Sequence, residues 1–299
     1  MKIQKNKLIS IDSDDIKDGV LYLPESVEKI ADGAIQYPEE QLVKVVAPGL
    51  LSIGNDNFHE CEELTHFEAP LLKSIGDLNF MTCNELISFE APLLTSIGFD
   101  NFNECNELLR FVAPVLTDFA GNNFRYCNAL TEFEAPILTS IGDENFNGCD
   151  ALTRFEAPLL TYIGDENFND CNMLTDFEIP KLTSIGSGNF RYCDALLRFE
   201  APKVTSVGKD NFQKCDVLTS VRFGAHQYTV KSANRMLTII EKSESSDGLL
   251  IHTGFIFNNC KGGVPNLSET VLIEKEDLSA HGETVEKAME ALEYKISIQ

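Results

Sequence analysis

Eight cysteines offer thiol or metal chemistry, and they recur at a constant spacing. They follow one another every 22 residues, and a phenylalanine stands three positions before each of them. They are Cys61, Cys83, Cys105, Cys127, Cys149, Cys171, Cys193 and Cys215. Zinc sites use pairs of ligands a few residues apart, whereas consecutive thiols here are one whole period apart. The spacing therefore disfavours a metal site.

Disulfides between equivalent cysteines are disfavoured as well. If each period forms one coil of a stack, neighbouring strands lie about 4.7 to 4.9 Å apart, but equivalent side chains point the same way rather than toward each other. We expect reduced thiols that pack in the interior as small apolar groups. We expect no metal ion and no cofactor.

Other catalytic chemistry finds little support. The five histidines share no spacing with a serine, cysteine or carboxylate that is typical of a triad, a zinc motif or a phosphate loop. His252, Cys260 and His281 could meet in space, but three such residues are unspecific. The acidic turns at residues 142–145 and 164–167 offer oxygen ligands for calcium, yet Asp143 as a helix cap is the simpler interpretation. The sequence predicts a protein that is not an enzyme, with no catalytic residues.

The cysteines belong to a repeat that can be written Leu-x-x-Phe-x-Ala-Pro-x-Leu-x-x-Ile-Gly-x-x-Asn-Phe-x-x-Cys-x-x. Its Leu-x-x-Phe-x-Ala part alternates as a short strand with one buried face does, and the proline ends the strand because it has no N–H for a neighbour. Phe80 and Cys83, with Leu86 three further on, indicate one or two turns of α-helix or 3₁₀-helix on the opposite side. Periods of about 20 to 29 residues are typical of solenoids.

This pattern resembles the BspA-like leucine-rich repeats, whose units read Leu-x-x-(apolar)-x-(apolar)-Pro-x-x-Leu-x-x-Ile-Gly-x-x-Ala-Phe-x-x-Cys. The unit here is one residue shorter, and asparagine stands where the family usually has alanine. These asparagines are Asn57, Asn79, Asn101, Asn123, Asn145, Asn167, Asn189 and Asn211. The resemblance implies a leucine-rich solenoid with a binding role, and it names no ligand.

The asparagine column has two interpretations. It could recognise a ligand at the surface, or it could form a ladder in which each amide satisfies backbone groups of its own and adjacent repeats. We favour the ladder, because buried loop backbone needs partners and asparagine both donates and accepts hydrogen bonds.

The predicted fold is an α/β solenoid. It is a leucine-rich repeat with a parallel concave sheet and short helical or 3₁₀ turns on the convex side, and a small α+β cap follows it. A parallel β-helix is the runner-up, but it needs further strands in each coil. We predict an N-terminal cap with one degenerate repeat at residues 1–41, an array of 22-residue units at residues 42–223 and a small α+β module at residues 224–299.

The last 76 residues follow a different pattern. Apolar or alternating runs predict strands at residues 235–240, 249–257 and 270–273. Thr284 is a predicted N-cap, because apolar residues at helical spacing follow it.

The charge of the chain limits its partners. It carries a net charge of −23, from 24 basic and 47 acidic residues. This balance disfavours binding to a nucleic-acid backbone and favours basic partners or none. No apolar run is long enough to suggest a membrane span. Residues 9–15 are acidic where a signal peptide needs an apolar core, so we expect a cytoplasmic protein, with export by a specialised route left open.

The outward-facing side chains of the repeat strands are the remaining candidates for a functional surface. If Phe67 and Ala69 point inward, His66 and Glu68 point outward, and equivalent positions form two charged columns. The predicted concave binding face consists of Glu68, Glu90, Arg110, Glu132, Glu134, Arg154, Glu156, Asp176, Glu178, Arg198 and Glu200. We expect a protein or peptide partner with a basic surface, and neither nucleic acid nor membrane. Two alternatives stay open: a face charged only for solubility, and an array that only supports or spaces the C-terminal module.

Overall fold

The computed structural model describes residues 1–36 and 41–298 of the chain. These residues form two compact units, Met1–Met173 and Leu174–Gln299. The division between the units falls within the repeats. The domain boundaries that the sequence predicts, at residues 41/42 and 223/224, mark the two ends of the repeat array. The division into two units does not test them, so these boundaries stay a prediction.

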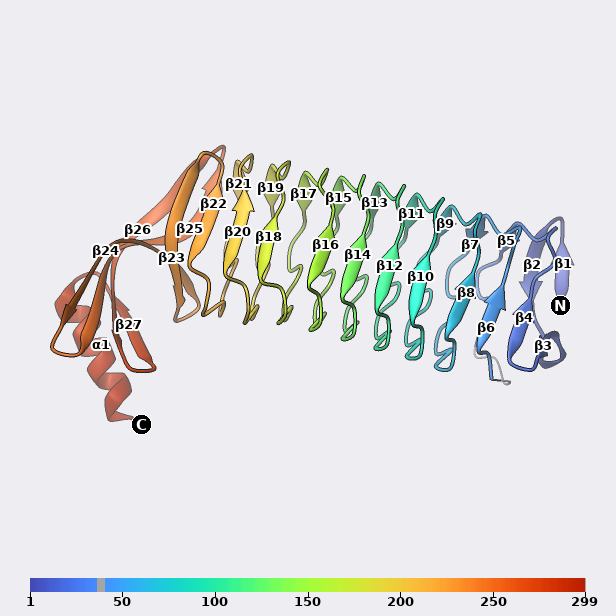
Figure 1. Cartoon of the computed structure of the whole chain (residues 1–299), viewed down its shortest axis with the longest axis horizontal. Helices are drawn as coiled ribbons and strands as arrows, with labels where there is room; N and C mark the ends of the chain where they lie inside the picture. The colour runs from blue at the N-terminus through green and yellow to red at the C-terminus, as the bar shows by residue number, and fades with distance from the viewer. Residues whose placement is uncertain (37–40, 299) are drawn as a thin grey trace. The chain divides into compact units, whose positions relative to one another are not determined.

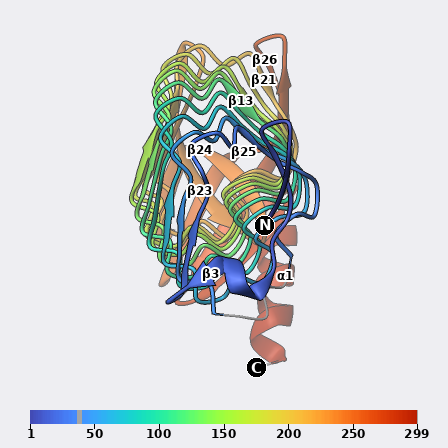
Figure 2. The same cartoon turned by 90° about the vertical axis from the view of Figure 1, so that its right-hand side faces the viewer.

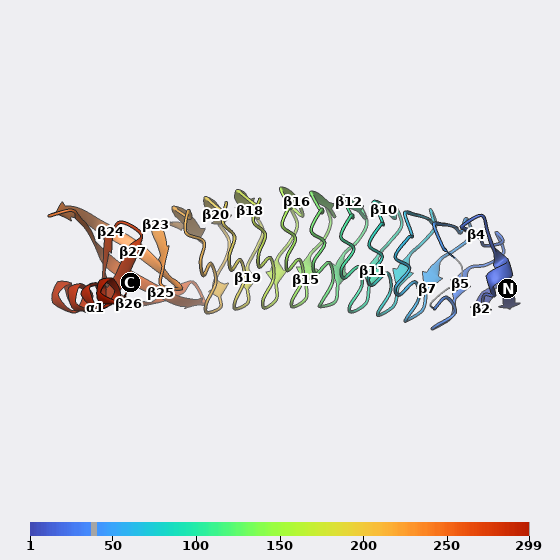
Figure 3. The same ribbon diagram turned by 90° about the horizontal axis from the view of Figure 1, so that it is seen from below.

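Each coil of unit 1 contributes two short strands to two parallel rows (Figure 1). The three-residue strands are β4 (Val20–Tyr22), β6 (Lys44–Val46), β8 (His66–Glu68), β10 (Ser88–Glu90), β12 (Arg110–Val112), β14 (Glu132–Glu134) and β16 (Arg154–Glu156). The two-residue strands are β5 (Lys29–Ile30), β7 (Ser52–Ile53), β9 (Ser74–Ile75), β11 (Ser96–Ile97), β13 (Asp118–Phe119), β15 (Ser140–Ile141) and β17 (Tyr162–Ile163). Figure 3 shows β7, β11 and β15 in one row and β10, β12 and β16 in the other.

Two hairpins cover the first coil. Strand β1 (Lys2–Gln4) pairs antiparallel with β2 (Lys7–Ser10), and β2 continues the row of two-residue strands. A 3₁₀-helix, η1 (Ser13–Asp15), leads to β3 (Ile16–Lys17), which pairs antiparallel with β4. Both rows therefore end on an antiparallel strand, and the apolar side chains of the first coil are kept from water.

Equivalent residues pair one period apart. Phe89 lies opposite Phe111, which lies opposite Phe133, and Ile75 lies opposite Ile97. The coils of unit 1 accordingly follow nearly the same path (Figure 2). A slip by one residue would turn every buried side chain to the surface, so the period sets the register. The prediction of a leucine-rich solenoid with a largely parallel sheet is confirmed.

The predicted helical turns at the Phe-x-x-Cys segment are wrong. Leu78, Phe80 and Thr82 have φ angles of 59°, 55° and 60°, which neither an α-helix nor a 3₁₀-helix allows. The N–H group of Phe80 donates to Asn57 O in the preceding coil at 3.2 Å, and that of Thr82 donates to Asn103 O in the next coil at 2.7 Å. Hydrogen bonds between coils thus replace those within a helix. Each coil of unit 1 instead contains a second short strand. The sequence predicts such further strands only in the alternative fold, a parallel β-helix.

The proposed helix cap at Asp143 is wrong for the same reason. Its carboxylate Oδ1 accepts a hydrogen bond from the backbone N–H of Asp165 in the next coil, at 2.8 Å. Asp77 accepts in the same way from Phe99 N at 2.8 Å. This column of acidic side chains therefore joins coils at their turns.

Phenylalanine and cysteine fill the interior of the coils. Phe80 and Phe102 stack with ring centroids 5.1 Å apart and planes 4° apart, and Phe89 meets Phe102 edge-on at 4.8 Å. The Cys127 thiol donates to Phe102 O at 3.0 Å, and burial raises its pKa well above the ordinary value. All eight repeat cysteines are buried and free, so the predicted interior packing of the thiols is confirmed.

The asparagine ladder is confirmed. The backbone N–H of Asn101 donates to Asn123 Oδ1, and that of Asn123 donates to Asn145 Oδ1, both at 2.8 Å. The Asn123 amide nitrogen donates to three turn carbonyls, at 2.9 to 3.1 Å. All eight asparagines are buried. They satisfy backbone groups that water cannot reach.

Unit 2 joins further repeats to an antiparallel sheet. Its repeat strands are β18 (Asp176–Glu178), β19 (Ser184–Ile185), β20 (Arg198–Ala201), β21 (Ser206–Val207) and β22 (Ser220–Phe223). The antiparallel strands are β23 (His226–Ala233), β24 (Met236–Ser246), β25 (Leu249–Lys261), β26 (Val264–Lys275) and β27 (Leu278–Gly282). The three strands expected here are present as parts of β24, β25 and β26, and the structure adds β23 and β27.

The predicted helix and its N-cap are confirmed. Helix α1 (Val285–Ser297) begins after Thr284, whose hydroxyl accepts from Lys287 N at 3.3 Å. Ala288 and Leu292 of the helix pack with buried apolar side chains of β26 and β27. One face of the antiparallel sheet is thereby covered.

A core substitution and a surface substitution separate the two faces of the strands. Phe146 is fully buried and stacks on Phe124 and Phe168 at 5.2 and 5.0 Å. We expect Phe146→Ala to lower the free energy of unfolding by about 3 to 5 kcal/mol, through lost burial and a cavity. Glu156→Ala, at a side chain 40% exposed, should change it by about 0.5 kcal/mol or less. Equal shifts in a urea titration would contradict this assignment.

The asparagine ladder can be tested in the same assay. Asn123→Ala removes the acceptor of Asn101 N and the donor to three turn carbonyls. We expect a loss of at least about 2 kcal/mol, because buried polar groups lose their partners. Asn128→Ala is the control, since this exposed amide donates to Asn106 Oδ1, at 3.2 Å, and lies at the surface rather than in the interior. Similar effects of the two substitutions would argue against the ladder.

Candidate binding face and C-terminal polar cluster

The outward side chains of five strands in unit 1 form what we call the charged face. Each three-residue strand turns its middle residue inward and its two outer residues to the surface, as alternation requires. The charged face consists of His66, Glu68, Ser88, Glu90, Arg110, Val112, Glu132, Glu134, Arg154 and Glu156. It contains seven of the eleven residues expected to bind a partner.

Ion pairs connect the carboxylates of the charged face. Arg110 lies 3.1 Å from Glu90, 3.3 Å from Glu132 and 3.0 Å from Glu134. Arg154 lies 2.6 Å from Glu156 and 4.0 Å from Glu132. The charged face is thus a network of mixed charge rather than an uninterrupted acidic strip. Exposed pairs of this kind contribute about 0 to 1 kcal/mol each, so they can exchange partners at little cost.

The other four residues of the predicted face belong to unit 2. Asp176 and Glu178 lie on β18, and Arg198 and Glu200 lie on β20, in register with them. Arg198 Nε lies 3.1 Å from Asp176 Oδ1. Unit 2 therefore repeats the pairing of arginine with carboxylate on its own strands.

The row of three-residue strands in unit 1 opens between β8 and β10. Ala47, Ala91 and Ala113 each donate a backbone N–H to the next coil, at 2.8 to 3.0 Å. Ala69, the equivalent residue of β8's coil, makes no such bond in the part of the chain that the structure describes. The described strands of this row form two sheets, β3-β4-β6-β8 and β10-β12-β14-β16. We call this interruption the β8–β10 gap.

A cavity of about 470 Å³ lies at the β8–β10 gap. It is lined by His66, Phe67, Glu68, Ala69, Pro70, Ser88, Glu90 and Pro92. The two glutamate side chains are 53% and 63% exposed, so their carboxylates face solvent. The cavity combines an apolar base with two carboxylates and the Ala69 N–H group, for which the described residues provide no inter-coil acceptor. These groups suit an extended peptide that carries a cationic side chain.

Sequence reasoning identified Glu68 and Glu90 but not the gap between them. The repeat around Ala69 and Pro70 has the same pattern as the repeat around Ala91 and Pro92, and nothing in it signals a lost backbone bond. The prolines and Ser88 were missed as lining residues for the same reason.

The three residues proposed to meet in the C-terminal module do not gather into one site. His252 bonds Ser243 Oγ at 2.7 Å and Glu274 Oε2 at 3.1 Å. His281 bonds a different pair of residues, and the Cys260 thiol donates to Thr205 O at 3.6 Å. Among the described residues, no three His, Cys, Asp or Glu side chains are arranged to hold a metal ion.

His281 is held as a neutral base. Lys295 Nζ donates to Asn234 Oδ1 at 2.6 Å, so the Asn234 amide nitrogen faces His281 Nδ1, at 3.1 Å, and donates to it. The other ring nitrogen lies 2.8 Å from Thr238 Oγ1. Burial and the Lys295 ammonium lower the pKa of His281 to about 4, although Glu274 opposes them.

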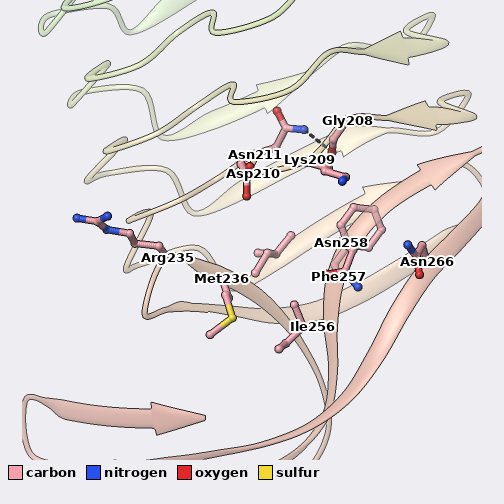
Figure 4. A pocket seen from close by; sticks show the side chains of 11 residues that line it. Gly208, Lys209, Asp210, Asn211, Arg235, Met236, Ile256, Phe257, Asn258 and Asn266 are labelled. Carbon is pink, nitrogen blue, oxygen red and sulfur yellow. Dashed lines mark hydrogen bonds between the residues drawn. The ribbon is translucent and has the colours of Figure 1, made fainter. Parts of the chain in front are cut away.

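A second cavity, of about 290 Å³, lies within unit 2 (Figure 4). Met236, Ile256 and Phe257 supply apolar walls, and Lys209 and Asn258 supply polar groups. Figure 4 shows the Arg235 side chain extending away from the others. This cavity was not anticipated, because its lining comes from segments far apart in the sequence.

No helix within residues 1–36 and 41–298 is long and apolar enough to cross a membrane.

The antiparallel strands of unit 2 are bonded to one another and to the last repeat strands.

Comparison with known proteins decides the family. The model for the BspA type leucine-rich repeat region matches residues 19–131 and 117–234, in six copies. The chain belongs to this family. Repeats of this kind are generally of the binding type and typically non-catalytic. No curated protein matches the chain.

Two solved structures resemble the BspA-type chain. A leucine-rich repeat protein of T. pallidum, TpLRR, is 20% identical with a TM-score of 0.37, and the match covers 68% of this chain and 78% of that one. A leucine-rich repeat protein from Eubacterium ventriosum ATCC 27560 is 17% identical with a TM-score of 0.36, and the match covers 70% of this chain and 75% of that one.

The buried His281 makes stability depend on pH. Its folded pKa of about 4 lies below the ordinary 6.5, so between these values the unfolded chain binds a proton that the folded protein does not. We expect the free energy of unfolding to fall as pH drops from about 6.5 to about 4. His281→Gln should flatten this dependence in urea titrations, whereas His226→Gln, at an exposed histidine, should leave it as in the wild type. Identical pH profiles of the wild type and His281→Gln would contradict the assignment.

Proposed function

We propose that this BspA-type protein binds a protein or peptide partner with a basic surface through the charged face, and that it catalyses no reaction there. The observation that supports this most directly is the β8–β10 gap, where a backbone donor and two carboxylates border one cavity. The remaining charged face extends the same surface over β12, β14 and β16.

Charge favours a cationic side chain at the gap. Glu68 pairs with Lys44 of the preceding coil and Glu90 pairs with Arg110 of the following coil. Both pairs involve strands on the far sides of the gap, so a lysine or arginine of a partner can approach between the two glutamates. The net charge of −23 attracts such a partner over longer distances and raises its association rate.

Backbone recognition would supply the second part of the affinity. Among the described residues, the Ala69 N–H group lacks the inter-coil bond that Ala47 and Ala91 make, and in this proposal a carbonyl group of an extended peptide accepts it. Pro70 and Pro92 beside it offer rigid apolar surface. Main-chain bonds of this type give affinity without sequence preference, and the carboxylates add the preference for basic residues.

The cytoplasmic location expected from the sequence remains part of this proposal. Nine buried free cysteines are consistent with a reducing compartment.

A second candidate function is a support for the C-terminal module. Strand β23 pairs with β22, and Val207 of β21 pairs with Cys260 of β25, so the module closes both strand rows within unit 2. If the array only supports this module, deletion of the two repeats at residues 86–129 should leave the biological activity intact. A binding role of the charged face predicts its loss, because the deletion removes Glu90 and Arg110.

A displayed library of extended peptides tests the binding proposal. We expect selection on the full-length protein to enrich peptides with lysine or arginine. Glu68→Gln combined with Glu90→Gln should weaken their binding about tenfold or more, since two favourable charge contacts are lost. Higher salt should weaken wild-type binding and affect this double variant less.

A double variant away from the charged face is the control. Glu85→Gln combined with Glu107→Gln changes the net charge equally at two exposed turn residues. Equal affinities of both double variants would show that overall charge, and not the gap, attracts the peptides. Absence of any enriched basic peptide would reject the proposal.

A further inference from the structure

Three side chains on the C-terminal sheet form a continuous hydrogen-bonded chain. Ser243 Oγ lies 2.7 Å from His252 Nδ1, and His252 Nε2 lies 3.1 Å from Glu274 Oε2. The three residues come from the neighbouring strands β24, β25 and β26. Ser243 is directly opposite His252, which is opposite Leu272, two residues before Glu274. The three side chains therefore share one face of the sheet and are held by regular strand pairing.

The serine is exposed, and the two groups behind it are largely buried. Ser243 is exposed, whereas the side chains of His252 and Glu274 are 8% and 15% exposed. Lys231 Nζ lies 2.6 Å from Glu274 Oε2, the same oxygen that His252 Nε2 contacts. Substrate can reach the hydroxyl, while the two groups behind it are shielded and fixed in place.

The hydrogen-bond roles follow from the chemistry of the carboxylate. An ionised carboxylate that pairs with Lys231 only accepts hydrogen bonds, so His252 carries its proton on Nε2 and donates it to Glu274. His252 Nδ1 is then an acceptor, and the Ser243 hydroxyl donates to it. A nucleophile, a base that can take its proton and a group that orients the base thus stand in the required order.

We propose that Ser243 is the nucleophile of an acyl-transfer centre that hydrolyses activated esters, with His252 as its general base and Glu274 as a positioning residue. This activity is separate from partner binding at the charged face. It lies in residues 243–274, beyond the last residue that the repeat-family model matches, so the non-catalytic character of the repeats does not extend to it.

The reaction balances with water as the second substrate. Ser243 Oγ forms a bond to the ester carbonyl carbon while its proton passes to His252 Nδ1. The bond to the leaving oxygen then breaks, and His252 returns the proton to the departing alcohol. Water attacks the resulting acyl-serine with His252 again as base, which releases the carboxylic acid and restores the Ser243 hydroxyl.

The exposure of Ser243 defines the class of substrate. Negative charge on the carbonyl oxygen is solvated by water during the attack, because the hydroxyl lies on the open surface of the sheet. Such a site provides less stabilisation than an enclosed oxyanion hole, so the ester needs a good leaving group. We expect slow turnover of aryl esters.

Covalent labelling of the full-length protein tests the proposal. We expect a fluorophosphonate probe to modify the protein at one site, located at Ser243 by peptide mass mapping. Ser243→Ala should abolish labelling and lower p-nitrophenyl acetate hydrolysis to the level of the uncatalysed reaction. Ser246→Ala is the matched control, since this serine is also exposed on β24 and its hydroxyl donates to Asp247 Oδ2 rather than to a histidine; the variant should react as the wild type does.

Two further variants separate chemistry from a structural role. His252→Gln should slow labelling at least about 100-fold, because the base is lost. Glu274→Gln should lower kcat about tenfold or more and leave KM for the ester unchanged, as a positioning residue does. Circular dichroism checks that the variants fold. Absence of labelling in the folded wild type, or labelling at Ser243 that His252→Gln does not slow, would reject the proposal and leave the charged face unaffected.

Discussion

The structure depends on hydrogen bonds that run from coil to coil. Within unit 1, the side-chain oxygen of an asparagine accepts the backbone N–H of the asparagine in the preceding coil, as Asn79 does from Asn57 at 3.0 Å and Asn101 does from Asn79 at 2.9 Å. The amide nitrogens bond the turn carbonyls. A residue inserted in one coil would displace the asparagine from its partner and the phenylalanine from its stack together. This double requirement keeps the period at 22 residues.

The same constraint shapes the surface. Because the interior repeats without a shift, outward residues also lie in columns, and glutamates of adjacent coils come close to one another. Arg110 and Arg154, two coils apart, both form ion pairs with these carboxylates. At the β8–β10 gap the backbone ladder is interrupted while the phenylalanine stack continues, with Phe67 and Phe89 5.7 Å apart. The gap is therefore an interruption of the backbone ladder above a continuous core.

The C-terminal module is organised differently from the repeats. Its long antiparallel strands bring together residues that no period relates, and their side chains form polar clusters around His252 and His281. His281 is held neutral by hydrogen bonds to an amide and a hydroxyl group. His252 links the exposed Ser243 to the Glu274 carboxylate, which pairs with a lysine. The repeats present a regular surface, and the module brings side chains from distant parts of the sequence together.

The sequence by itself determined the solenoid, the buried phenylalanines and cysteines, and the asparagine ladder. It could do so because a strict period places equal residues in equal surroundings, so one repeat explains all of them. It also indicated the outward columns and the N-cap at Thr284, since strand alternation and helix capping are local rules.

Only the tertiary structure decided the rest. The spacing of Phe80 and Cys83 is compatible with a helical turn, but bonds to the neighbouring coils favour a backbone with positive φ, and local spacing contains no information about those bonds. The β8–β10 gap lies between repeats of the same pattern. Ser243, His252 and Glu274 meet because hairpin register places them on one face, and the register follows from packing between strands rather than from the spacing of these residues along the chain.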